Sequence, residues 1–360
     1  MSANIKSEVV KGSITVFLDD RKMRILRVII NDYIDSAEPI GSRHISKNLE
    51  IGLSSATIRN EMADLEEMGF LEQPHTSAGR IPSEKSYRLY VDQMMDKIEL
   101  SQNEISEISY GLEHKINELN QLIKRASVVI SKITNYPSIA VTPNMKKSIL
   151  KAVQVVPVEI GMALIIVVTS TGTIRNKLVK IPAETTPDYL ITFSNILNGH
   201  LSGLSIDRIT PKLFLEIERQ RGVPLELIGP ILDGIIECIE QIDSPEFYLD
   251  GSVNIFNHPE FHNIGKAQKL LHAMGQQETL KKIVFSNPDN SDLIIRIGSE
   301  NDIEEMKGCS LLTASYSIGD EVIGTIGVIG PTRMNYSKVA TSLNYVRNKI
   351  NSELNNLIGK

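Results

Sequence analysis

The chain has 360 residues, of which 41% are hydrophobic and 23% charged, with a net charge of −6. This composition excludes a mainly disordered, collagen-like or membrane-embedded chain. Two cysteines, Cys238 and Cys309, provide neither a disulfide framework nor a zinc-binding spacing, so we expect a reducing cytoplasm, no metal and no other cofactor. No apolar stretch reaches the roughly 18 residues of a membrane span. Residues 1–19 lack the apolar core of a signal peptide and are expected to form an N-terminal extension.

Residues 20–100 show the pattern of three short helices followed by a hairpin. A first helix is expected from Asp20 to Asp35 with its apolar side chains on one face, and Pro39 marks the start of a second. Ser54 has the side chain of an N-cap, and Gly69 ends the third helix. A strand at residues 70–72 and small residues before Ile81 then predict a hairpin. This order is typical of a winged helix-turn-helix domain.

The third helix carries side chains that can bind DNA near its N-terminal end. We expect Arg59 and Asn60 to read base edges, because Arg pairs with guanine and Asn with adenine. We expect other residues of the helices and the hairpin to bind phosphates, cap the helix or enter the minor groove. These further DNA-binding candidates are Arg43, Ser54, Ser55, Thr57, His75, Thr76, Ser77 and Arg80.

The charge of this segment is not that of a basic domain. Residues 20–97 contain 11 Lys and Arg against 13 Asp and Glu, a net charge of −2. Affinity for DNA therefore requires a local basic face, because phosphate contacts dominate nonspecific binding. Two alternatives remain open, namely a polar helical domain with a solvated charged face and a protein-interaction module. The expected basic face comprises Arg43, Lys47, Arg59, Arg80, Lys85 and Arg88.

The rest of the chain alternates between helix and strand patterns. We expect one α/β domain, made of residues 101–185 with a linker helix at 101–135 and residues 285–360, interrupted by an insertion at 186–284. The expected strands are 163–169, 173–181, two within 247–255, 293–297, 310–317 and 321–329. The expected helices are 186–201, 211–219, 224–242, 264–283 and 337–357.

Several separated motifs follow one another in the order found in a known family. They are PIGSR at residues 39–43, SSATIRNEMADLE at 54–66, HTSAGRIPS at 75–83, YLDG at 248–251, PEF at 259–261 and GVIGPTRMNY at 327–336. In these motifs the chain resembles the HrcA family of heat-inducible transcription repressors. The resemblance covers residues from about 18 to the C-terminus and leaves residues 1–17 outside.

The resemblance implies a bacterial, cytoplasmic repressor of chaperone operons. Such a repressor is a homodimer that binds an inverted-repeat operator, the CIRCE element, through its winged helix. Its body resembles a GAF-like domain that holds an inserted dimerisation domain. The GroEL chaperonin is expected to keep the repressor active, until misfolded protein titrates GroEL away under heat. This predicts an α+β multidomain chain that binds double-stranded DNA and GroEL and no membrane.

The helix at 224–242 has an apolar stripe that could form the dimer interface. An intrachain core is the alternative, and the pattern does not decide between them. The stripe comprises Ile228, Ile231, Leu232, Ile235 and Ile236.

Two rival functions differ in what the body does. A small-molecule-responsive repressor would use the GAF-like body as a ligand pocket, and an enzyme would need convergent titratable groups. No catalytic constellation stands out, so we expect no enzyme. The glycines at 324, 327 and 330 follow a strand pattern instead of a phosphate-binding loop. We expect Arg333 to form an internal salt bridge, and the pair His258 and His262 to be structural or on the surface.

Overall fold

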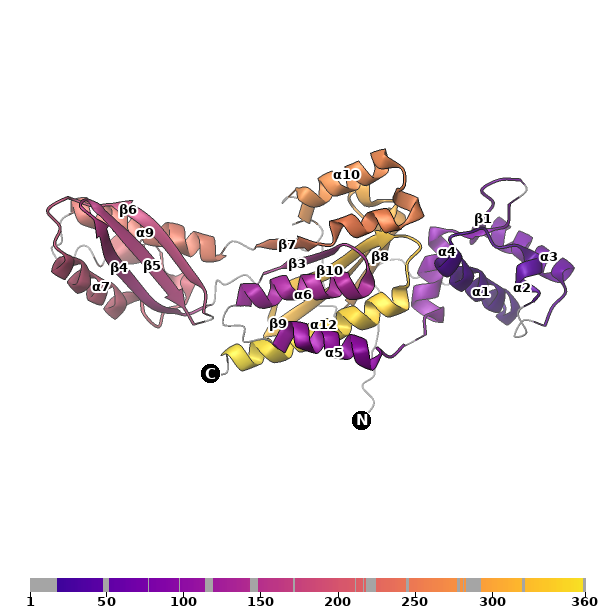
Figure 1. Cartoon of the computed structure of the whole chain (residues 1–360), viewed down its shortest axis with the longest axis horizontal. Coiled ribbons are helices and arrows are strands. Elements are labelled where there is room, and N and C mark those ends of the chain that lie inside the picture. Colours follow the sequence, from indigo (N-terminus) through magenta and orange to yellow (C-terminus); the bar gives the residue numbers. More distant parts are fainter. Residues whose placement is uncertain are drawn as a thin grey trace.

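The computed structural model shows three parts arranged in a row: a helical N-terminal unit, a central α/β body, and a three-stranded unit at the other end (Figure 1). Within the described part of the chain, no helix combines the length and the apolar character needed to cross a membrane. The structure describes residues 18–358 apart from 48–51, 77, 97, 114–118, 143–147, 171, 211, 216, 218–224, 244–245, 277–278, 281, 283–292 and 319–320.

The N-terminal unit forms around the apolar face of its first helix, α1. Asp19 caps this helix by accepting a hydrogen bond from the backbone N–H of Lys22, and Ile25 and Ile29 on its inner face are fully buried. The predicted order of helices and hairpin is confirmed. Its elements are α1 (Asp20–Ser36), α2 (Ser42–Ile45), α3 (Ser55–Glu67), β1 (Leu71–Glu72), β2 (Ile81–Pro82), α4 (Glu84–Leu89) and the π-helix η1 (Tyr90–Met94).

The body is built on a five-stranded antiparallel sheet of strand order β7-β3-β10-β9-β8. Both faces are covered, because neighbouring residues such as Leu311 and Leu312 on β9 are buried in different apolar clusters. The strands are β3 (Ser138–Val141), β7 (Phe247–Asp250), β8 (Leu293–Ile297), β9 (Cys309–Ile318) and β10 (Glu321–Pro331). The covering elements are α5 (Gln102–Glu113), α6 (Leu119–Thr134) and α12 (Tyr336–Ile358) on one face, and η3 (Ser252–Asn257), η4 (Pro259–Phe261) and α10 (Ile264–Gly275) on the other.

Two expectations for the body need correction. The predicted linker helix at 101–135 consists of two helices, α5 and α6, which pack against each other. The second strand expected around Asp250 and Gly251 is the 3₁₀ helix η3. Gly251 has a φ of +63°, and this left-handed residue turns the chain out of the sheet instead of back along β7.

The three-stranded unit contains β4 (Leu150–Glu159), β5 (Met162–Thr169), β6 (Ile174–Lys180), α7 (Pro187–Leu201), η2 (Ile206–Arg208) and α9 (Leu225–Asp243). Among the described residues these strands hydrogen-bond in their own sheet, of order β4-β5-β6, and not with the sheet of the body. The expected boundary between residues 185 and 186 therefore cuts through one unit. The reason is that α9, which the sequence pattern placed in another domain, packs on the inner face of the strands predicted at 163–169 and 173–181.

The apolar stripe of α9 faces inward. Ile228, Ile231, Leu232 and Ile235 are between 0% and 8% exposed within the single chain, and the partly buried Ile236 packs against the same core. A Cβ atom on Gly234 would come within 2.4 Å of Ile165 on β5, so α9 lies directly on the sheet. Of the two interpretations left open for this stripe, its burial within the single chain favours the intrachain core over a dimer interface, because buried side chains offer no surface to a partner.

Candidate DNA-binding surface

The N-terminal end of α3 is organised by hydroxyl groups. Ser54 is the N-cap, and its Oγ accepts a hydrogen bond of 3.1 Å from the backbone N–H of Thr57. The hydroxyls of Ser54 and Thr57 also lie 2.9 Å apart, and Ser55 Oγ donates to Ser46 Oγ at 2.9 Å. The predicted cap is confirmed, and these four hydroxyls shape the start of the helix.

Three polar side chains remain available to a ligand on this surface. Arg59 and Asn60 on α3, and Arg43 on α2, are exposed and have no hydrogen bond or ion pair with the described residues through their side chains. The helix core keeps these residues in place, because Ile58, next to Arg59, is fully buried. An unpaired guanidinium beside a carboxamide can bind the edges of bases.

Two of the carboxylates of α3, those of Glu61 and Asp64, are paired with cations of α1, a feature that the sequence did not reveal. Lys22 on α1 lies 2.8 Å from Glu61 and 3.0 Å from Asp64, and Arg21 lies 3.4 Å from Glu61. Hydrogen bonds to Glu61 and Asp64 raise the pKa of Lys22 above its ordinary value. These pairs lower the repulsion that α3 would exert on a phosphate backbone, although the segment as a whole is acidic. The sequence did not reveal these ion pairs, because charge patterns along a helix relate residues three or four positions apart. The paired residues of α1 and α3 are about 40 positions apart in the chain.

An ion pair connects the β1–β2 hairpin to α3. Arg80 forms an ion pair with Glu66 of α3, with Nε 2.9 Å and one terminal nitrogen 2.8 Å from the same carboxylate oxygen. A phosphate at this position would have to share the guanidinium with Glu66. His75 and Thr76 at the hairpin tip are exposed, and Ser77 lies outside the described residues. Gln73, which the sequence reasoning did not select, holds the tip by donating to the carbonyl oxygens of Thr76 and Ala78.

Gly79 is required by a close approach of two backbones. Ile40 and Arg80 form an isolated antiparallel bridge with N···O distances of 2.9 and 2.8 Å. A Cβ atom on Gly79 would lie 2.4 Å from the carbonyl oxygen of Ile40. The glycine therefore permits the contact that joins the hairpin to the segment before α2.

Two residues of the expected basic face point elsewhere. Lys85 donates to the carbonyl oxygen of Met68 and lies 4.3 Å from the centre of the Phe70 ring. Arg88 is buried against the body, where it donates to the carbonyl oxygen of Ile295 on β8. The prediction that Arg88 belongs to a DNA-binding face is wrong, because its helix position is on the inner side of α4.

The other sequence candidates have structural roles. Both cysteines are buried, and burial raises the pKa of Cys238 to about 11 and of Cys309 to about 12. The His258 ring stacks on Tyr136 with centroids 4.7 Å apart, and burial lowers its pKa. Over the described ranges, no group of three His, Cys, Asp or Glu residues could hold a metal ion. Gly324, Gly327 and Gly330 all lie inside β10.

Known proteins resemble the chain over nearly its whole length. A family model described as the HrcA protein C terminal domain matches residues 120–340, more than half of the chain. The heat-inducible transcription repressor HrcA of Acetivibrio thermocellus is 53% identical over 346 residues, which are 96% of this chain and 99% of that protein. The chain belongs to the HrcA family. The HrcA of Ruminiclostridium cellulolyticum is 55% identical over 345 residues, 95% of this chain and 99% of the relative.

A solved structure shares the fold of this HrcA-family chain. It is a crystal structure described as that of a hypothetical protein, with a TM-score of 0.67 and 21% sequence identity. The alignment covers 95% of this chain and 100% of the other. The likeness extends over all three parts of the molecule and shows a common mixed α/β fold.

Proposed function

We propose that this chain is a heat-inducible transcription repressor that binds double-stranded DNA through α3. The observation that carries the proposal is the pair of exposed side chains Arg59 and Asn60, which have no side-chain partner among the described residues, on a helix whose Glu61 and Asp64 are paired with Lys22 of α1. The membership of the HrcA family supports the same function. In this proposal α3 enters the major groove and its hydroxyl-rich N-terminus lies against the phosphate backbone.

The three parts correspond in this proposal to three roles. Residues 18–96, with three helices and a hairpin joined through the Ile40–Arg80 bridge, form a winged-helix unit. The five-stranded sheet with its covering helices is the GAF-like body. The unit from β4 to α9 is the inserted dimerisation domain, with bounds near residues 148 and 243 in place of 186 and 284.

The outer face of the β4–β5–β6 sheet suits the dimer contact better than α9. Neither α7 nor α9 packs on this face, which carries Val156, Leu164, Ile166, Val168, Ile174 and Leu178. Ile174 is 51% and Leu178 47% exposed. A continuous apolar row across three strands is unusual on a free surface and typical of a protein interface. An inverted repeat such as CIRCE requires two subunits related by a two-fold axis.

The heat response in this proposal passes through GroEL. When GroEL is free it maintains the active repressor, and when misfolded protein occupies it the active fraction falls. A loss of about 1–2 kcal/mol in folding free energy is enough to change the active population several-fold. The exposed apolar sheet face is a surface that a chaperonin could bind before the dimer forms.

Fluorescence anisotropy tests the proposal directly. The purified chain is titrated into a labelled CIRCE duplex and a scrambled duplex of the same length over a salt series, with and without GroEL. We expect tight binding selective for the inverted repeat and an increase in active protein with GroEL. Equal, weak binding to both duplexes without an effect of GroEL contradicts it, and a screen for ligands that shift both melting temperature and DNA affinity then tests the small-molecule alternative.

A further inference from the structure

The proposed DNA-binding surface and the proposed dimer contact lie at opposite ends of the molecule (Figure 1). The distance between the two DNA-binding units of a dimer therefore depends on how firmly each unit is held by its own body. Contacts between the N-terminal unit and the body fix the orientation of the unit. They gather around α1, α4 and the segment that joins β10 to α12.

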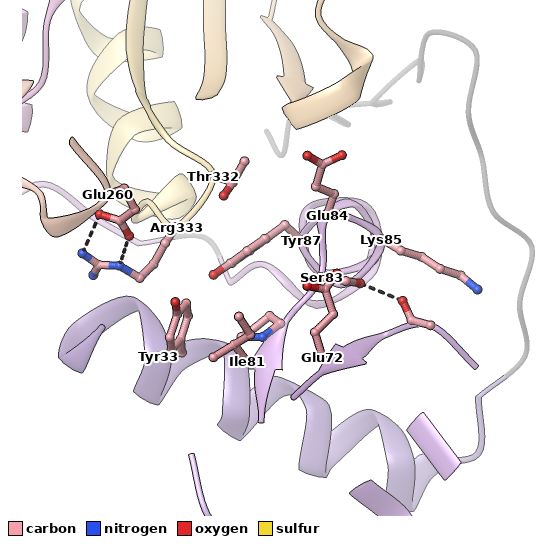
Figure 2. A pocket seen from close by; sticks show the side chains of 12 residues that line it. Tyr33, Glu72, Ile81, Ser83, Glu84, Lys85, Tyr87, Glu260, Thr332 and Arg333 are labelled. Atoms are coloured by element: carbon pink, nitrogen blue, oxygen red, sulfur yellow. Dashed lines mark hydrogen bonds and ion pairs between the residues drawn. The ribbon is translucent and has the colours of Figure 1, made fainter. Parts of the chain in front are cut away.

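Arg333 connects three parts of this junction. Its Nε lies 2.6 Å from one oxygen of Glu260 on η4, and its Nη2 lies 3.4 Å from the other. Its Nη1 donates to the carbonyl oxygen of Ile34, near the C-terminal end of α1 in the N-terminal unit. The Arg333 side chain is only 10% exposed and that of Glu260 27% exposed. Figure 2 shows the paired groups at one side of a cleft, beside Tyr33 of α1.

A second polar contact closes the other side of the junction. On α4, Glu84 accepts hydrogen bonds from the backbone N–H and the hydroxyl of Ser299, at 3.0 and 2.7 Å. Arg88, also on α4, donates to the carbonyl oxygen of Ile295 at 3.1 Å and lies 3.2 Å from Glu300. Both helix residues thus bind the body at the end of β8.

Between the two polar contacts the junction is only partly packed. A cleft of about 420 Å³ separates the units and is lined by Tyr33, Tyr87 and Thr332 among others. Tyr87 packs against Tyr336 of the body with ring centroids 5.9 Å apart, and its buried hydroxyl has no hydrogen-bond partner among the described residues. Apolar contacts are not directional, whereas a guanidinium bound at three nitrogens permits one orientation.

We infer that Arg333 is a positioning residue that holds the DNA-binding unit in one orientation relative to the body. The inference rests on the proposed function, because its consequence for DNA is the spacing between two half-sites. Arg333 touches no part of the α3 surface that would meet the bases. Loss of its contacts should leave binding to a single half-site unchanged and weaken the preference for one spacing between half-sites.

The substitution Arg333→Met tests this while keeping an unbranched apolar stem of similar shape. Binding is measured for inverted repeats whose spacer is lengthened or shortened one base pair at a time, and for a single half-site. We expect the wild-type preference for the best spacer to fall at least fivefold, with half-site affinity unchanged within twofold. Arg333→Lys should restore part of the preference, since an ammonium can reach Glu260 or Ile34 but lacks the fork that binds both.

The matched control is Lys307→Met, which also removes a cation. Lys307 pairs with Glu304 within the body, 2.5 Å away, and crosses no junction. This variant should keep the wild-type spacing profile. An unchanged profile in Arg333→Met, or an equal change in Lys307→Met, overturns the inference.

A distance measurement decides the inference without DNA. Spin labels are placed on Asn31→Cys in α1 and Lys269→Cys in α10, both at exposed positions, while the buried Cys238 and Cys309 stay unreactive. Labelled chains are diluted with unlabelled ones so that only distances within one chain are seen by pulsed electron paramagnetic resonance. A narrow distribution in the wild type that broadens in Arg333→Met supports the inference, and an unchanged distribution overturns it.

The two hypotheses fail in different ways. If the wild type does not bind the inverted repeat, the proposed function fails and the spin-label distances alone judge the positioning role. If Arg333→Met does not fold, Glu260→Gln replaces it, because this variant removes the charge on the partner and retains its size. It should broaden the distance distribution in the same way, and an unchanged one again overturns the inference.

Discussion

The exposed edge of α3 and the outer face of the β4–β5–β6 sheet lie at the two ends of one chain and differ in chemistry (Figure 1). The α3 edge is polar, with Arg59 and Asn60 unpaired among the described residues and with Glu61 and Asp64 paired with Lys22 of α1. The sheet face is rich in apolar side chains, with Ile174 and Leu178 about half exposed, although Gln154 and Asn176 lie among them. The α3 edge exposes hydrogen-bond donors, and the sheet face exposes apolar side chains.

The difference teaches which kind of partner each end can accept. Unpaired donors on a helix suit a ligand rich in acceptors, such as base edges and phosphates. Bare apolar side chains suit a surface of their own kind, such as a second copy of the sheet. The following changes test this contrast, beginning with the largest expected effect.

Leu164→Glu, in the middle of the outer sheet face, should convert the proposed dimer into a monomer. Because a monomer engages one half-site at a time, we expect affinity for the inverted repeat to fall by about a hundredfold or more. Sedimentation equilibrium and operator titration measure the two effects. The fold should persist, since Leu164 is only partly buried within the chain.

The control is Leu232→Glu, on the apolar stripe of α9. Leu232 is 8% exposed, so a carboxylate there should unfold the three-stranded unit instead of separating intact subunits. Far-ultraviolet circular dichroism distinguishes these results. A stable, folded monomer from Leu232→Glu, together with an intact dimer from Leu164→Glu, would return the interface to α9.

Arg59→Ala should weaken binding to the operator by about 1–3 kcal/mol if the guanidinium contacts a guanine in bidentate fashion. Binding to a scrambled duplex should change much less, because a base contact carries sequence preference and a phosphate contact does not. Anisotropy with both duplexes measures this. Equal losses on the two duplexes would show that Arg59 binds phosphate.

Lys22→Met should also reduce DNA affinity, by about 1 kcal/mol or less, although Lys22 is expected not to touch DNA. The change leaves Glu61 without its closest cation and removes the ion pair of Asp64 on the helix proposed to face the phosphates. The loss should shrink at high salt, where such repulsion is screened. Arg24→Met on α1 is the control and should not affect binding, since among the described residues the Arg24 side chain donates a hydrogen bond only to the carbonyl oxygen of Asp20.

Glu104→Gln in the body should affect neither surface and so defines the baseline of the comparison. Glu104 accepts hydrogen bonds from Ser101 and pairs with Lys338 at 3.0 Å, and these contacts lower its pKa to about 2. The carboxylate therefore contributes stability above its ordinary pKa of 4.5, which is lost as the pH falls towards 2. We expect the variant to be less stable by about 0.5 kcal/mol at pH 7 and equal to the wild type near pH 2, in denaturant titrations. A difference that does not depend on pH would exclude this carboxylate as the cause.

Local patterns in the sequence were sufficient for α1, α3 and their caps. The apolar spacing of α1, the hydroxyl of Ser54 and the glycine at 69 act within one or two turns, so they can be recognised without knowledge of the fold. The internal salt bridge expected for Arg333 is also confirmed, although its partner Glu260 could not be named. Short elements such as β3 were missed, because a four-residue apolar run is equally compatible with helix and strand.

The sequence by itself determined the family, the order of the helices and hairpin in the N-terminal unit, and the candidate side chains of α3. The tertiary structure alone decided that β4, β5 and β6 form a separate sheet, that the α9 stripe is core, and that Lys22 pairs with Glu61 and Asp64 of α3. The physical reason is the range of the interactions. Caps and amphipathic faces are set by neighbours in the chain, whereas sheet partners, buried faces and ion pairs join residues that only folding brings together.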